Sequence, residues 1–383
     1  MTPEEVALLS ELTIIIPTYN RPLELERAIE YWRDTPVTVH ILDGSENPWF
    51  PTGLLDATDR IFYHYKPRQV SEQAAENYLK RIRFGVELSA TSYSAICADD
   101  DFFAVGPLLR SLKILNSSDL VDAVIGQPIV YQKIRNSLVW LYDKNVIVNS
   151  EIYHQEVTRR LFRPFQGALY FGIVKTKIWQ EIHLRQTAAN FWNIVCNEYL
   201  AHFLASTMCR THVIDEYLWL RNFETRNAGS LRGRSLKFVD WLNDRNSMTE
   251  IRDFKHRLAM AMCLVDESLT YRVASEFVEA RMKVVPRHRD EMKKRFEINI
   301  KKYFLIVLSK LPSKVRQFLF ACLSEGLKSR LGDHTFRYNF SPRRIIDYRS
   351  VDSTSASRLE NVLLMPCEDL RLRANISDWC CEI

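Results

Sequence analysis

Hydrophobic runs alternate with amphipathic stretches along the first third of the chain. Four short runs are rich in β-branched or aromatic side chains, which is typical of buried strands: residues 12–16, 37–42, 61–65 and 93–97. Between and after them, apolar residues recur at helical spacing, beginning at Pro22, near Ser71 and at Gly106. We expect Asn20 to cap the first of these helices. Such alternation predicts an α/β fold with a mostly parallel sheet, right-handed crossovers and helices on both faces.

Beyond residue 123 the pattern of the chain becomes mixed. Three runs predict strands that extend the sheet in an antiparallel manner: residues 124–125, 129–131 and 138–142. Residues 191–205 return to helical spacing. The run 165–174 contains Gly167 and Gly172, which indicate either a β-bulge or a close approach of the backbone to a ligand.

Polar side chains follow the ends of three predicted strands. Asn20 follows the first strand, Asp43 follows the second, and Asp99, Asp100 and Asp101 follow the fourth. In parallel sheets ligands gather beyond the carboxyl ends of the strands. We therefore expect these side chains to line one site.

The three adjacent aspartates are the strongest candidates for chemistry. Three anions side by side repel one another, so a fold tolerates them where water or a cation screens them. One interpretation is a solvated acidic turn. The other is a set of ligands for a hard divalent ion, Mg²⁺ or Mn²⁺, which is shared with substrate phosphates. The polar residues at the neighbouring strand ends favour the metal site.

Composition limits the class of protein. The 383 residues are 46% hydrophobic and 26% charged, which is typical of a globular protein with one large and one smaller domain. The net charge of +5 does not indicate a nucleic-acid partner. Eight cysteines are scattered without a Cys-x-x-Cys pair, as in proteins that keep their thiols reduced. Without a signal-peptide pattern or an apolar run of about 18–20 residues, we expect a cytoplasmic protein.

Basic clusters alternate with apolar runs from Arg281 to Leu323. Such blocks either lie peripherally on an anionic membrane, here the inner face of the cell membrane, or form the solvated face and core of a helical domain. The sequence predicts three parts: a large α/β domain over residues 1–245, a basic helical extension over 246–332 and an irregular tail over 333–383.

The motifs of the N-terminal half occur in a recognisable order. They are Thr-Ile-Ile-Ile-Pro-Thr-Tyr-Asn-Arg at 13–21, Leu-Asp-Gly-Ser at 42–45, Asn77, and Ala-Asp-Asp-Asp at 98–101. In this order they resemble the family 2 glycosyltransferases with a GT-A fold, over roughly residues 12–230. The resemblance implies metal-dependent transfer of a sugar from a nucleotide-sugar donor to an acceptor hydroxyl, with inversion. A UDP-sugar is favoured as donor, and a glycan, a lipid-linked or another hydroxyl as acceptor, in bacterial surface polysaccharide or other glycoconjugate synthesis.

The resemblance also implies roles for individual residues. The implied donor-binding residues are Pro17, Thr18, Tyr19, Arg21, Asp43, Asn77, Asp99 and Arg221. The implied metal ligands are Asp99, Asp100 and Asp101. Because Ala98 can align with the family's first aspartate, either Asp100 is the main ligand or Asp99 and Asp101 serve together. The histidine often found after the base is absent, so Arg221 or Arg226 would face the diphosphate.

The implied catalytic base is a carboxylate near the start of a helix, and the matching residue is Glu198, which Asn197 precedes. Its stretch is otherwise apolar and aromatic, where a carboxylate is suited to taking a proton. Two structural alternatives stay open for Glu198: a pair with His202 one helical turn on, or a side chain turned to solvent. Glu224 is the next candidate for the base.

Other enzyme classes find little support in the sequence. We see no Ser-His-Asp set, phosphate loop or Gly-x-Gly-x-x-Gly motif, so hydrolase, kinase and dehydrogenase functions are not indicated. A nucleotidylyltransferase on a similar scaffold would carry a glycine-rich, basic first loop, which residues 17–21 are not. A non-catalytic sugar-nucleotide-binding scaffold would need neither the intact aspartates nor Glu198.

Overall fold

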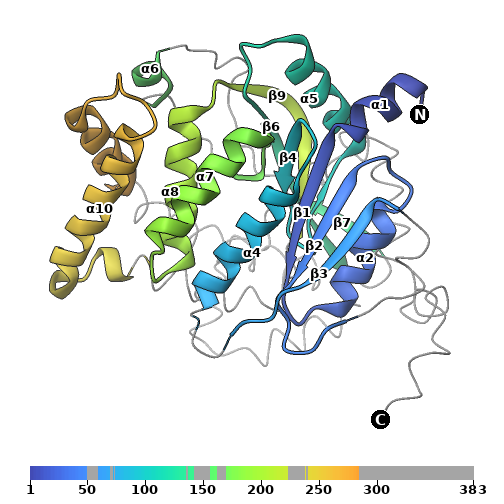
Figure 1. Ribbon diagram of the computed structural model, residues 1–383, viewed down its shortest axis with the longest axis horizontal. Helices are drawn as coiled ribbons and strands as arrows, with labels where there is room; N and C mark the ends of the chain where they lie inside the picture. The colour runs from blue at the N-terminus through green and yellow to red at the C-terminus, as the bar shows by residue number, and fades with distance from the viewer. Residues whose placement is uncertain are drawn as a thin grey trace, which may run out of the picture. The chain divides into compact units, whose positions relative to one another are not determined.

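The computed structural model describes residues 1–49, 59–69, 72, 74–134, 137–141, 156–161, 170–222, 238 and 240–283. The described residues up to Phe277 belong to one compact unit, and a second unit begins at Val278. The first unit is a sheet with helices packed around it (Figure 1). The expected α/β class is therefore confirmed. The division at residues 245 and 332 stays a prediction.

Within the described residues, nine strands form one sheet. The strands are β1 Leu12–Thr18, β2 Thr38–Asp43, β3 Ile61–Tyr65, β4 Tyr93–Ile96, β5 Phe102–Phe103, β6 Ala123–Ile134, β7 Ser137–Leu141, β8 Ile173–Lys175 and β9 Thr211–Asn222. Their order is β3-β2-β1-β4-β8-β6-β9-β5, and β7 pairs with β6 beside this path. The four N-terminal strands are parallel. They therefore end at the same edge of the sheet.

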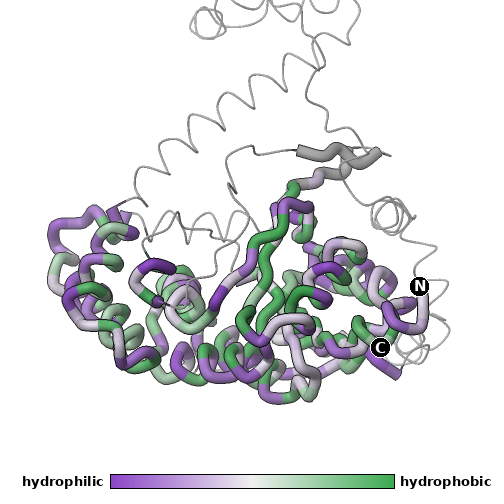
Figure 2. Tube along the Cα trace, turned by 90° about the horizontal axis from the view of Figure 1, so that it is seen from above, coloured by the Kyte–Doolittle hydropathy of each residue, from purple (hydrophilic) through white to green (hydrophobic). Residues whose placement is uncertain are grey.

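Helices cover the sheet. They are α1 Pro3–Ser10, α2 Pro22–Trp32, α4 Ala74–Leu88, α5 Val105–Ser117, α6 Val157–Leu161, α7 Thr176–Ala189, α8 Ile194–Met208 and α10 Met248–Cys263, and residues 271–283 are also helical. Helix α4 packs against α7, α7 against α8 and α8 against α10, so these four follow one another in space (Figure 1). Hydrophobic residues concentrate along the central strands, while the helices carry hydrophilic residues as well (Figure 2).

Strand β1 is predominantly apolar because it is buried on both faces. Ile14 and Ile16 share a core cluster with Leu25 and other residues of α2. Ile15 points to the opposite face, where its Cγ2 would lie 2.9 Å from a Cβ placed at Gly85 of α4. A strand covered by helices on both sides cannot alternate apolar with polar residues. Burial on both faces thus explains the run of mostly apolar residues at 12–16.

The expected cap at Asn20 is wrong. Helix α2 begins at Pro22, and its N-cap position is Arg21. Asn20 has a left-handed φ of 53°, a conformation that asparagine tolerates better than most residues. Its backbone N–H donates to Ser45 Oγ at 2.7 Å, and its side-chain oxygen accepts from the backbone N–H of Glu46 at 3.2 Å. Asn20 therefore joins two strand ends instead of starting a helix.

The C-terminal half of the sheet differs in part from the expectation. Strand β6 runs through both predicted segments, with a register irregularity beside Gly126. It is antiparallel to β7 and β8, as expected, but it is parallel to β9. The start of the predicted helix at Ser71, and residues 165–169 with Gly167, lie outside the described residues.

Along the parts of the chain that the structure describes, no helix combines the length and apolar character that crossing a bilayer requires. The basic region from Arg281 to Leu323 is described only as far as residue 283. The prediction of peripheral membrane contact through this region stays open.

We expect Gly126→Ala to destabilise the fold more than Gly85→Ala. A Cβ at Gly126 would press against Leu218 Cβ and lie 2.8 Å from the backbone oxygen of Glu216. A backbone atom cannot move aside easily, so the free energy of unfolding should fall by about 1–3 kcal/mol. The Cβ of Gly85→Ala would meet side-chain methyl groups, 2.7 Å away at Leu42 Cδ1. Denaturant unfolding of both variants measures the difference, and equal losses would contradict the assignment of a tight β6–β9 contact.

Candidate functional site

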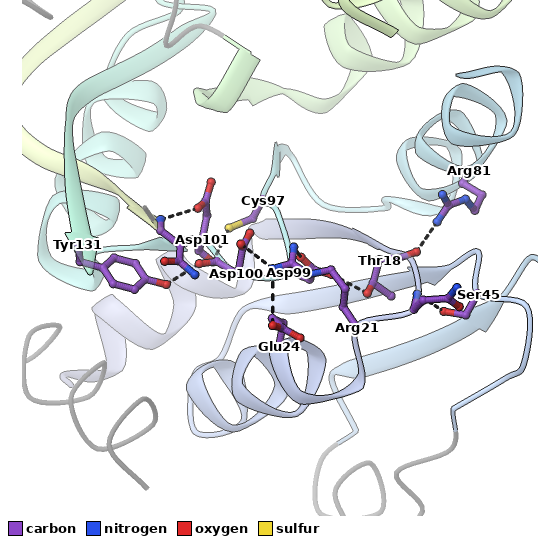
Figure 3. A network of polar contacts seen from close by, with 12 residues as sticks. Thr18, Arg21, Glu24, Ser45, Arg81, Cys97, Asp99, Asp100, Asp101 and Tyr131 are labelled. Carbon is purple, nitrogen blue, oxygen red and sulfur yellow. Dashed lines mark hydrogen bonds and ion pairs between the residues drawn. The ribbon is translucent and has the colours of Figure 1, made fainter. Parts of the chain in front are cut away.

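The ends of β1, β2 and β4 bring polar side chains together at one edge of the sheet. Thr18 and Asp43 are register partners at the last positions of β1 and β2. Thr18 Oγ1 donates to Asp99 Oδ2 at 2.6 Å, which connects β1 to the segment after β4 (Figure 3). The structure therefore gathers the strand-end residues that the sequence singled out.

Asp43 is held through both carboxylate oxygens. Its side chain is buried, with 1% of its surface exposed. Oδ1 accepts from the backbone N–H of Ser45 at 2.8 Å and from Ser45 Oγ, and Oδ2 accepts from the Tyr63 hydroxyl at 2.5 Å. Burial, and then the bond to Asp43, raise the pKa of Tyr63, so the phenol stays protonated as a donor. The orientation of the Asp43 carboxylate is fixed by these contacts.

Arg81 of α4 connects the ends of β1 and β2 through hydrogen bonds. Its Nη1 donates to the carbonyl oxygens of Thr18 and Leu42, at 2.7 and 2.8 Å, and its Nε donates to Asn77 Oδ1 at 3.0 Å. A Cβ at Gly44 would lie 2.7 Å from Nε and Nη1 of this guanidinium. Gly44 therefore makes room for Arg81. Only glycine leaves this space.

Asn77 thus has a visible structural role beside its implied contact with a donor. It orients Arg81 through Oδ1, and its Nδ2 donates to Glu72 Oε2 at 3.1 Å. Sequence reasoning missed Arg81. The spacing of four between Asn77 and Arg81, on one helical face, is the signal that could have indicated the pair.

Asp99 and Asp100 share one cation, Arg21. Arg21 Nη1 donates to Asp99 Oδ1 at 2.5 Å, and Nη2 donates to Asp100 Oδ2 at 2.7 Å. Both aspartates are buried, as is Asp101. A solvated acidic turn is therefore excluded. Burial and repulsion from Asp100 raise the pKa of Asp99 to about 7, against the opposing effect of the Arg21 charge.

Asp101 turns toward β9 and away from Arg21. Its Oδ2 accepts from Trp219 Nε1 at 3.0 Å, and its Oδ1 accepts from the backbone N–H of Asn222 at 2.9 Å. Burial and the neighbouring Asp100 raise the pKa of Asp101 to about 7, and the Arg221 charge opposes this. Arg221 itself is exposed and lies with its Cζ 5.4 Å from the centre of the Trp219 ring.

A divalent ion fits two of the three aspartates. The described residues contain no group of three or more His, Cys, Asp or Glu side chains placed to hold a metal together. Asp99 and Asp100, however, already share a positive charge, that of the Arg21 guanidinium between them. Oxygen ligands from one or two carboxylates, completed by phosphates, are what Mg²⁺ uses in many enzymes. Both carboxylate oxygens of Asp101, in contrast, accept hydrogen bonds from β9.

A cavity of about 300 Å³ lies in front of these strand ends. It is lined by Thr18, Asn20, Arg21, Pro22, Leu25, Asp43, Ser45, Asn47, Pro48 and Trp49. Three of the implied donor-binding residues, Thr18, Arg21 and Asp43, therefore face one space. Sequence reasoning missed Asn47, Pro48 and Trp49, whose signal was the turn that follows Asp43.

The other five implied donor-binding residues, Pro17, Tyr19, Asn77, Asp99 and Arg221, lie outside this lining. Tyr19 is exposed, and its hydroxyl donates to Glu46 Oε1 at 3.1 Å. Pro17 is half-buried within β1.

Glu198 lies in the second turn of α8 and is half-buried. Helix α8 starts at the cap Asn193, whose side chain accepts from the backbone N–H of Val195. The Asn197 side chain bonds both backbone groups of Phe191 and so braces the start of the helix. In this way the local sequence fixes the turn that carries Glu198.

Three tyrosines, Tyr78, Tyr170 and Tyr199, lie within electrostatic reach of Glu198. Burial raises the pKa of Tyr78 to about 12, and the charges of Glu198 and Asp99 both add to the rise. Tyr78 of α4 thus lies within electrostatic reach of the predicted base and of Asp99. Burial lowers the pKa of His202 to about 4, so at pH 7 its imidazole carries no charge with which to form an ion pair with Glu198. The alternative base, Glu224, and Arg226 lie outside the described residues.

Neither a protein-family model nor a curated protein matches this sequence. Several solved structures are similar at low identity. TarS 1–349 from S. aureus, in complex with UDP-GlcNAc, is 11% identical over 70% of each chain, with a TM-score of 0.46. A second structure of TarS 1–349 is 10% identical over 74% of this chain and 91% of that chain, with a TM-score of 0.40. The mannosyltransferase PcManGT from Pyrobaculum calidifontis, in complex with GDP-Man and Mn²⁺, is 11% identical over 96% of this chain and 88% of that chain, with a TM-score of 0.39. Similarity at this level does not assign an activity to this chain.

Proposed function

We propose that this chain is a glycosyltransferase, which transfers a sugar from a nucleotide-sugar donor to an acceptor hydroxyl with inversion. The observation that carries the proposal is the meeting of Thr18, Asp43 and Asp99 at adjacent ends of parallel strands. Thr18 and Asp43 face a cavity that Arg21 also lines. Ligands of α/β sheets bind at this kind of edge. The order of the motifs that resemble family 2 glycosyltransferases supports the same function.

The nucleoside of the donor would occupy the cavity between Asp43 and Trp49. Its volume of about 300 Å³ is at the lower limit of small-molecule pockets. Asp43 would accept a hydrogen bond from the base, because Ser45 and Tyr63 fix the orientation of its carboxylate, which lines the cavity. Pro17, Tyr19 and Asn77 are supported as donor-site residues by the resemblance alone.

The diphosphate would lie beside Arg21, Asp99 and Asp100. Mg²⁺ or Mn²⁺ held by Asp99 and Asp100 would neutralise the charge that develops on the diphosphate leaving group. Arg21 lines the cavity and can donate two parallel hydrogen bonds to phosphate oxygens. Arg221 is exposed near Asp101 and would reach the diphosphate from the β9 side.

Glu198 would act as the catalytic base. An acceptor hydroxyl has a pKa far above 7, so its proton must be taken up while it attacks the sugar. With one carboxylate to take the proton, the acceptor hydroxyl would attack the anomeric carbon from one side while the nucleoside diphosphate leaves from the opposite side. The reaction would then be a single displacement. A single displacement inverts the anomeric configuration.

The wider biological role stays a proposal that the sequence motivates. It comprises a UDP-sugar donor, a bacterial surface polysaccharide or other glycoconjugate as product, a cytoplasmic location, and membrane contact through Arg281–Leu323. A nucleotidylyltransferase is disfavoured because Arg21 and the residues before it form a short turn between β1 and α2, with no glycine-rich loop for a triphosphate.

A donor screen tests the function. Purified protein is incubated with UDP-, GDP- and CMP-sugars, UDP-GlcNAc and GDP-Man among them, with Mn²⁺ or Mg²⁺, and released nucleotide is measured. We expect release from one nucleotide class, loss of release in EDTA, and recovery when Mn²⁺ is restored in excess. Absence of release from every donor would contradict a transferase. Full release in excess chelator would contradict the role of the divalent ion.

Glu198→Gln tests the base. Glutamine keeps the shape of the side chain but cannot accept the proton, so kcat should fall by roughly 10²–10⁴-fold while donor binding is nearly unchanged. Glu181→Gln is the matched control, because Glu181 lies on the adjacent helix α7 in a surface pair with Arg185. A rate near that of the wild type for Glu198→Gln would move the base to another residue, with Glu224 tested next.

A further inference from the structure

Arg21 occupies the position between the two carboxylates that the proposed function gives to a metal ion. Its two Nη atoms each donate to a different aspartate, at 2.5 Å to Asp99 and 2.7 Å to Asp100. The Arg21 side chain is 15% exposed, and the two aspartate side chains are 4% and 6% exposed. Two buried carboxylates in sequence need a cation nearby. In this structure Arg21 supplies it.

The same guanidinium also has alternative partners within reach. Glu24 Oε1, in the first turn of α2, lies 3.8 Å from Arg21 Nη2. Glu24 is more exposed than the aspartates, at 28%. Arg21 also lines the cavity in front of the strand ends. A guanidinium displaced from Asp99 and Asp100 could therefore pair with Glu24, which Figure 3 shows beside it, or with an anion in the cavity.

We propose that Arg21 is the resident counter-cation of Asp99 and Asp100, and that a divalent cation binds this pair only by displacing the Arg21 guanidinium. The two cations exchange because both need the same carboxylate oxygens. The exchange frees Arg21 to face the cavity, where the donor's diphosphate would be its partner. This inference rests on the proposed function for the identity of the competing ion. The contacts of Arg21 do not depend on it.

The exchange predicts weak metal binding in the absence of donor. When only a small fraction of molecules has its binding-competent arrangement, the apparent affinity of a ligand falls by that fraction. If Arg21 leaves the aspartate pair in between a hundredth and a tenth of molecules, the apparent Kd for a metal is raised roughly 10–100-fold. Removal of the guanidinium should therefore strengthen metal binding. An arginine that merely positioned the aspartates for the metal would have the opposite effect.

Mn²⁺ titration of the nucleotide-free protein tests the exchange. By calorimetry, Arg21→Met should bind Mn²⁺ on the order of 10–100-fold more tightly than the wild type. Arg33→Met is the matched control, since it removes the same charge from a half-buried arginine that pairs with Glu30 at the end of α2. Its affinity should equal that of the wild type. Unchanged or weaker Mn²⁺ binding by Arg21→Met would overturn the proposal.

Two further measurements keep the test decisive if Arg21→Met is poorly folded. Arg21→Lys retains the positive charge, but one ammonium group does not reproduce the paired donors of a guanidinium, so its Mn²⁺ affinity should lie between those of the wild type and Arg21→Met. Low millimolar guanidinium chloride should weaken Mn²⁺ binding to an Arg21→Ala variant and leave the wild type unaffected. Absence of both effects would overturn the exchange. Because no donor is present, these results are independent of whether the donor screen succeeds.

Discussion

Compensation of buried charge at the carboxyl ends of β1, β2 and β4 is the constraint on which the rest of the site depends. Asp43 and Asp99–Asp101 are all buried there. Ionised groups removed from water are costly unless donors or counter-ions meet them. Two arginines meet this need in different ways. Arg21 neutralises the pair Asp99 and Asp100, whereas Arg81 binds strand carbonyl oxygens and so holds the strand ends at a fixed separation.

Hydrogen bonds from two different strands, β1 and β9, hold the segment Asp99–Asp101 in place. Thr18 at the end of β1 donates to Asp99, and Trp219 of β9 donates to Asp101. The segment therefore connects the parallel N-terminal strands to the mixed C-terminal half. Asp100 lies between these two anchors and, through Arg21, is linked to the cavity. One short run of carboxylates thus serves both the integrity of the sheet and the chemistry in front of it.

The sequence was informative where the local pattern determines the contact. Burial of β1 and β2 on both faces follows from their apolar runs, and parallel strands bring Asp43 and the aspartates to one edge. It was uninformative where partners are distant, as between Asp101 and Trp219, which are 118 residues apart. The prediction of Asn20 as a helix cap failed because a contact with the segment after β2 holds it in a left-handed conformation. Arg81 was missed for the same reason, since its carbonyl partners come from two other elements.

The most direct test of the central claim is calorimetric binding of nucleoside diphosphates, with UDP and GDP as probes in the presence of Mn²⁺. If the cavity at the strand ends is the donor site, the wild type binds one of them and Asp43→Asn weakens binding roughly 10–100-fold, since a lost partner of a buried group costs about 1–3 kcal/mol. The exposed Asp34→Asn is the control, and its affinity should match that of the wild type. Equal affinities for the wild type and Asp43→Asn, or no binding of either nucleotide, would contradict a nucleotide site at this edge of the sheet.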